Sequence, residues 1–158
     1  MTTAKSLGLT LVASACLATS IAYAQPVADG GRKFTTPMSG AEECNAGGCG
    51  VGDPDGSGTG SITVNVGQDR VCWEFTVANV APVNRGHIHK APAGSNGPIV
   101  VDFFNVAAGT QGPLTGCTTA QLGKALLTDI IQNPSAYYLN LHNPDFPAGA
   151  IRGQLEKK

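Results

Sequence analysis

The sequence predicts an all-β fold, an antiparallel, Greek-key-like β-sandwich or barrel with one short helix. Two observations support this. Apolar and polar residues alternate with a period of two in several short runs, which is typical of strands with one buried face. Turn-forming Gly, Pro, Asn and Asp separate these runs, and only one stretch, about residues 119–132, shows helical spacing of its apolar residues.

The clearest strand pair lies in the middle of the chain. Residues 61–66 alternate Ile and Val with polar residues, residues 71–78 do so with Val, Trp and Phe, and a short polar turn separates the two runs. This pattern predicts a β-hairpin with Trp73 and Phe75 in the core. Further strands are predicted at residues 86–90, 99–104, 137–142 and 150–155.

Two other segments have distinct patterns. The glycine-rich stretch 44–60 carries no large apolar residue and is predicted to be a long loop. In the helical stretch, Thr118 or Thr119 is expected to cap the N-terminus, and Pro134 to stop the helix.

The first residues have the composition of an export signal. Lys5 precedes an apolar run over residues 7–22, and Ala22-Tyr23-Ala24 supplies a small-residue cleavage site. We expect a secretory signal peptide cleaved after Ala24, a flexible leading segment over residues 25–33 and one domain over residues 34–158. A lipoprotein signal ending at Cys16 is the rival interpretation.

The remaining four cysteines agree with an oxidising compartment. Four cysteines allow three pairings, of which we favour Cys44–Cys49, closing a short glycine-rich loop, and Cys72–Cys117, tying a strand to a distant loop. A four-cysteine zinc site is the alternative, although the spacing lacks paired C-x-x-C knuckles.

The charge pattern excludes several classes of partner. The formal net charge is −1 and no basic cluster is long enough for a nucleic-acid surface, and no apolar run is long enough for a membrane span. The Glu42-Glu43 pair is interpreted as a solvated surface pair, in surroundings too polar to raise a carboxyl pKa.

Two long blocks resemble the signature blocks of the CHRD (chordin-type) domain. The first joins Gly86-His87-Ile88-His89 to residues 96–101, and the second joins residues 137–142 to residues 146–155. Ser39-Gly40-Ala41-Glu42-Glu43 resembles the opening strand of the family, so the resemblance covers residues 34–155. It implies an extracellular or periplasmic β domain, and in chordin such domains belong to an antagonist of secreted signalling factors.

All three histidines of the chain, His87, His89 and His142, fall within these blocks. On a strand, His87 and His89 project from the same face. If the strand ending at His142 is a neighbour, three imidazoles converge, which suits copper or zinc. Ring nitrogens within about 3–4 Å of one another would fit one ion. The alternative is structural, with each ring hydrogen-bonded to a backbone carbonyl.

Several side chains are candidates to support such a site. Asn140 and Arg152 are expected in the layer behind the ligands, and Asp102 or Glu74 could supply an outer carboxylate. No residue is assigned a catalytic role.

We therefore expect a secreted or periplasmic CHRD-domain binding protein, with copper or zinc held by the three histidines. The first alternative is a metal-free module that binds an extracellular protein. The second is a mononuclear copper redox enzyme comparable to superoxide dismutases, in which Arg85 or Arg152 would guide a charged substrate.

Overall fold

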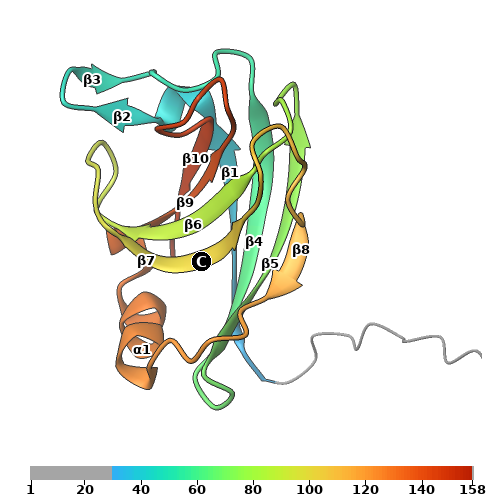
Figure 1. Ribbon diagram of the computed structural model, residues 1–158. Helices are drawn as coiled ribbons and strands as arrows, with labels where there is room; N and C mark the ends of the chain where they lie inside the picture. The colour runs from blue at the N-terminus through green and yellow to red at the C-terminus, as the bar shows by residue number, and fades with distance from the viewer. Residues whose placement is uncertain (1–29, 158) are drawn as a thin grey trace, which may run out of the picture.

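The computed structural model describes residues 30–157, in which eight strands form one antiparallel sheet that curves into a nearly closed barrel (Figure 1). The sheet order is β7-β6-β9-β10-β1-β4-β5-β8, and a separate hairpin pairs β2 with β3. The strands are β1 (Arg32–Ser39), β2 (Cys44–Asn45), β3 (Gly48–Cys49), β4 (Ser57–Asn65), β5 (Arg70–Ala78), β6 (Arg85–Lys90), β7 (Ile99–Asn105), β8 (Thr115–Cys117), β9 (Tyr137–His142) and β10 (Ile151–Gln154). The helices are η1 (Gly40–Glu42), α1 (Lys124–Gln132) and η2 (Pro134–Ala136). The predicted all-β class with one α-helix is confirmed.

Aromatic side chains from opposite sides of the barrel pack against one another in its core. In Figure 1, β6 and β7 run across β4 and β5, and the inward residues of these strands belong to one apolar core. Trp73 on β5 stacks on Phe103 of β7 with ring centroids 5.0 Å apart, and Phe75 packs against the same ring at 5.7 Å. The predicted placement of Trp73 and Phe75 in the core is confirmed.

The strand order makes β6 and β9 neighbours, although a long stretch of chain separates them. Their register pairs Arg85 with His142, His87 with Asn140 and His89 with Tyr138. Since side chains alternate along a strand, these paired residues share the outer face of the barrel, while the inner face carries Ile88, Leu139 and Leu141. All six residues of β9 are buried, so the outer face here is covered as well.

Helix α1 begins later than predicted, at Lys124 instead of residue 119. The predicted threonine cap is wrong because Thr118 exchanges hydrogen bonds with Val71 of β5, next to the three-residue strand β8. Gly123 precedes the helix with a φ of 89°, a conformation that favours glycine, and donates its N–H to Asp69. The helix ends at Gln132, before Pro134, as predicted.

The glycine-rich segment 44–60 is not one long loop. It contains the β2–β3 hairpin and the first four residues of β4. A Cβ at Gly60 would lie 2.5 Å from the Leu139 side chain, so this strand position needs glycine. Glycine carries no side chain that could reveal a period of two, which is why the sequence pattern missed the first four residues of β4. At the other end, β1 begins at Arg32 and finishes at Ser39, so the proposed opening strand 39–43 is in fact the end of β1 followed by η1.

Both favoured disulfides are present. Cys44 is bonded to Cys49 across the β2–β3 hairpin, and Cys72 is bonded to Cys117 between β5 and β8. The four-cysteine zinc site is therefore wrong, because the thiolates are consumed. The predicted signal peptide and its alternative at Cys16 lie outside the described residues. Within residues 30–157 there is no helix whose length and hydropathy would allow it to cross a bilayer.

Candidate metal centre

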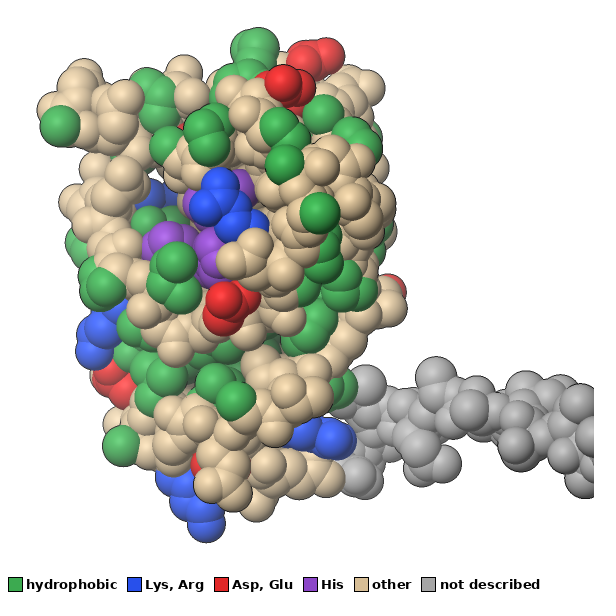
Figure 2. Space-filling view, in the orientation of Figure 1, with side chains coloured by type: hydrophobic (Ala, Val, Ile, Leu, Met, Phe, Trp, Pro, Cys, Tyr) green, Lys and Arg blue, Asp and Glu red, His purple; other side chains and the backbone are tan. Residues whose placement is uncertain are grey.

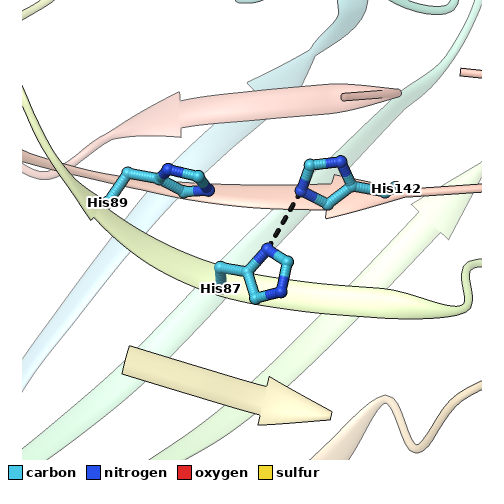
Figure 3. A group of neighbouring side chains, drawn as sticks. All are labelled: His87, His89 and His142. Atoms are coloured by element: carbon cyan, nitrogen blue, oxygen red, sulfur yellow. Dashed lines mark hydrogen bonds between the residues drawn. The ribbon is translucent and has the colours of Figure 1, made fainter. Parts of the chain in front are cut away.

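The three histidines converge on the outer face of β6 and β9. One ring nitrogen from each of His87, His89 and His142 lies within 4.8 Å of the others. Figure 3 shows the rings turned toward one another, two from β6 and one from the end of β9. The exposed fractions are 3%, 9% and 5%, yet Figure 2 shows the histidine group on one face of the molecule, between a basic and an acidic side chain.

Backbone carbonyls fix the tautomers of two of these rings. His89 Nδ1 lies 2.9 Å from the Gly97 carbonyl oxygen, and His142 Nδ1 lies 3.2 Å from that of Pro147. A carbonyl only accepts, so both Nδ1 atoms carry the proton and both Nε2 atoms carry a lone pair. The Nε2 of His142 lies 3.0 Å from Nδ1 of His87. The Nε2 of His89 is buried and has no hydrogen-bond partner among residues 30–157.

Burial keeps all three imidazoles neutral. It lowers the pKa of His87 to about 4, although the carboxylate of Asp102 acts in the opposite direction. Burial, together with the neighbouring His87, lowers the pKa of His142 to about 3. The pKa of His89 is also lowered by burial, against the hydrogen bond to Gly97. Neutral imidazole is the form that binds a metal ion, so the rings need not lose a proton at neutral pH.

The ring nitrogens of His87 and His142 are nearly as far apart as two ligands of one ion, but the three nitrogens together are spread more widely. Three ligands at ~2.0–2.1 Å from a tetrahedral ion are about 3.3–3.4 Å apart. The pair His87 and His142 nearly meets this spacing. The ring nitrogens of all three residues lie within 4.8 Å of one another, so a shared ion requires the longer nitrogen–nitrogen separations to shorten to about 3.4 Å.

A family model for the CHRD domain matches residues 34–155, which is nearly all of the described chain. The chain belongs to the CHRD domain family. The match includes both strands that carry the histidines and both loops whose carbonyls hold them. Comparisons with curated proteins and with solved structures returned no match. Membership of the CHRD family and two disulfides fit an extracellular or periplasmic location.

Arg152 anchors the loop that holds His89. It is 1% exposed, donates to the carbonyl oxygens of Ser95 (2.9 Å) and Pro92 (3.1 Å), and lies 3.4 Å above the ring of Tyr138. The ring of Tyr138 stacks in turn on His89 with centroids 4.8 Å apart. Arg152 of this CHRD domain thus contacts both the loop and the tyrosine that pack against His89, from a position buried away from solvent.

Asn140 connects the histidine layer to a buried carboxyl that the sequence interpretation missed. Its Nδ2 donates to Glu43 Oε2 at 3.0 Å, and Glu43 is 3% exposed. The interpretation of Glu43 as a solvated residue is therefore wrong, while Glu42 is exposed as expected. Burial raises the pKa of Glu43 to about 7, against Arg152 and Asn140, which lower it. The residues next to Glu43 in the sequence do not indicate its burial, because it is covered by residues distant in sequence. One of these is Gly149, whose Cβ would lie 2.4 Å from Glu43 Oε2.

Of the two carboxylates proposed to support the site, Asp102 lies beside His87 and Glu74 lies on another strand, β5. Asp102 on β7 pairs with His87 across the strands, and its Oδ1 lies 3.9 Å from His87 Nε2. Glu74 is exposed on β5, and the charges that act on the histidines come from Asp102, Arg85 and Arg152. Arg85 donates to the Pro147 carbonyl at 3.1 Å, the same oxygen that holds His142.

Proposed function

We propose that this CHRD domain acts outside the cytoplasm as a protein that binds one transition metal ion, copper or zinc, through His87, His89 and His142. The observation that carries the proposal is the Nε2 atom of His89, a buried lone pair without a hydrogen-bond partner among the described residues, beside two other neutral imidazoles. Leaving a buried acceptor unpaired costs about 1–3 kcal/mol, which a metal ion would offset.

The donor set selects the class of ion. Three neutral nitrogen ligands suit copper and zinc, whereas magnesium and calcium prefer carboxylate and carbonyl oxygens. The carbonyls of Gly97 and Pro147 hold the Nδ1 protons and so direct each Nε2 lone pair toward the ion. Bound copper would add redox chemistry, and bound zinc would add Lewis acidity.

The alternative of a metal-free interaction module has less support. Such a module would be favoured by an exposed apolar patch. Within residues 30–157, the large hydrophobic side chains that are exposed are Val51 (41%) and Ile99 (52%). Two isolated apolar side chains are ordinary for a protein surface.

Elemental analysis and isothermal titration calorimetry of protein purified without a histidine tag test the proposal. We expect one equivalent of copper or zinc per chain, and a loss of affinity of more than about 100-fold in His87→Gln and in His142→Gln. Glu74→Gln is the control, because it changes an exposed side chain on β5 that does not contact the imidazoles. Thermal unfolding verifies that each variant is folded. The proposal is wrong if neither metal is retained, or if the folded histidine variants bind as the wild type does.

A further inference from the structure

The hydrogen bond between His87 and His142 defines the tautomer of the third ring. Because Nδ1 of His142 donates to Pro147, its Nε2 can only accept, so the proton in the 3.0 Å contact belongs to Nδ1 of His87. His87 then carries its lone pair on Nε2, which lies on the side of the ring toward Asp102. In this state His87 presents a proton, and no lone pair, to His142.

Asp102 faces the wrong tautomer for a hydrogen bond. Its Oδ1 lies 3.9 Å from His87 Nε2, beyond the roughly 2.7–3.2 Å of an N–H···O bond, and both atoms are acceptors. The side chain of Asp102 is 57% exposed, so it can rotate toward the ring without disturbing the core. The register of β6 and β7 shifts on both sides of His87, as at β-bulges that re-aim side chains, and leaves Asp102 directly opposite His87.

With the proton on Nε2, both contacts of the ring change together. Nε2–H would donate to the Asp102 carboxylate, and Nδ1 would direct a lone pair at the lone pair of His142 Nε2. Two lone pairs at this distance repel each other unless a cation lies between them. The separation of 3.0 Å needs to widen by only about 0.3–0.4 Å to reach the spacing of two ligands on one tetrahedral ion.

We propose that metal binding shifts the His87 proton from Nδ1 to Nε2, and that Asp102 is the positioning residue that accepts the hydrogen bond from Nε2–H and so holds His87 in its metal-binding tautomer. One proton leaves Nδ1 and one arrives at Nε2, so the ring stays neutral and no net proton is released from it. A proton and a metal ion thus compete for the same position between His87 and His142. This inference rests on the proposed metal-binding function.

Nitrogen-15 NMR of the histidine side chains, recorded without metal and with zinc as the probe, reads the tautomer directly. We expect His87 to change from the Nδ1–H to the Nε2–H pattern on addition of zinc, while His89 and His142 keep Nδ1–H. Asp102→Ala should weaken zinc binding about 10–100-fold, and Asp102→Glu should restore most of the loss. Glu74→Ala, which removes an exposed strand carboxylate that does not act on the histidines, is the matched control and should bind zinc as the wild type does.

The outcomes separate this inference from the proposed function. If zinc, supplied in excess, does not bind the wild-type protein at all, this inference is wrong, and the proposed function is wrong with it if copper does not bind either. If zinc binds but His87 keeps its Nδ1 proton, or if the folded Asp102→Ala variant binds with wild-type affinity, the role of Asp102 is overturned and the metal site stands. A tautomer shift that is present in wild type and lost in Asp102→Ala, but regained in Asp102→Glu, is the result that a merely structural aspartate would not produce.

Discussion

Replacing Glu43 by glutamine should stabilise the protein above neutral pH and leave its stability unchanged in acid. Glu43 is 3% exposed, and burial raises its pKa from 4.5 to about 7. One pKa unit corresponds to about 1.4 kcal/mol, so a shift of this size represents about 3 kcal/mol of free energy that opposes ionisation in the folded state. Glutamine has nearly the same shape and carries no charge, and the Oδ1 of Asn140, which has no hydrogen-bond partner within residues 30–157, can accept a hydrogen bond from its amide.

The sign follows from where each state binds the proton. Between pH 4.5 and about 7, folded Glu43 keeps a proton that the unfolded chain has released. The free energy of unfolding of the wild type therefore falls as pH rises through this window, and the loss levels off above it. The glutamine variant lacks this loss, so its advantage should grow from near zero below pH 4.5 to about 3 kcal/mol at pH 8.

Urea denaturation at intervals between pH 4 and pH 9 measures this difference, with the metal-free protein in every sample. The control is Glu42→Gln, which removes an exposed carboxylate one residue away and should follow the wild type at every pH. A difference between Glu43→Gln and wild type that stays constant with pH would refute the argument, because a constant offset reflects packing and not ionisation. The same pH dependence in Glu42→Gln would refute it equally.

Two further predictions concern the disulfides and the histidines. Replacing both Cys72 and Cys117 by alanine should lower the free energy of unfolding by about 4 kcal/mol, because that disulfide spans a sequence separation of 45. The same change at Cys44 and Cys49, which are separated by 5, should lower it by about 2 kcal/mol. Urea denaturation measures both values. Between pH 6.5 and about 4, unfolded His87 binds a proton that the folded residue excludes, so stability falls as pH falls, and His87→Gln should flatten that slope by up to about 1.4 kcal/mol per pH unit.

The strands were predictable where side chains alternate and were missed where glycine replaces them. Residues of β5 such as Trp73 and Phe75 reveal a buried face directly, because every second residue is apolar. The start of β4 carries Gly58 and Gly60, which pack closely against Thr76 and Leu139 but show no periodicity. The short strand β8 was missed for a different reason, since its pairing depends on β5, more than forty residues away.

The convergence of the three histidines was only partly predictable from the sequence. The H-x-H spacing places His87 and His89 on one face of a strand, and this follows from strand geometry alone. That β9 lies beside β6, and so brings His142 to the same face, depends on the order of strands in the sheet. The burial of Glu43 depends on loops distant in sequence, so its neighbours in the sequence could not predict it.

The loops over the outer face explain why the resemblance to the CHRD family extends beyond the strands. Burying the apolar core of the barrel does not by itself require glycine at positions 97 and 149. A Cβ at Gly97 would lie 1.9 Å from the backbone oxygen of Lys90, and one at Gly149 would lie 2.4 Å from the carboxyl of Glu43. Both glycines let a loop close over buried polar side chains on the outside of the sheet. Gly97 also supplies the carbonyl oxygen that accepts the hydrogen bond from His89 Nδ1. The loop that covers His89 therefore also orients its imidazole.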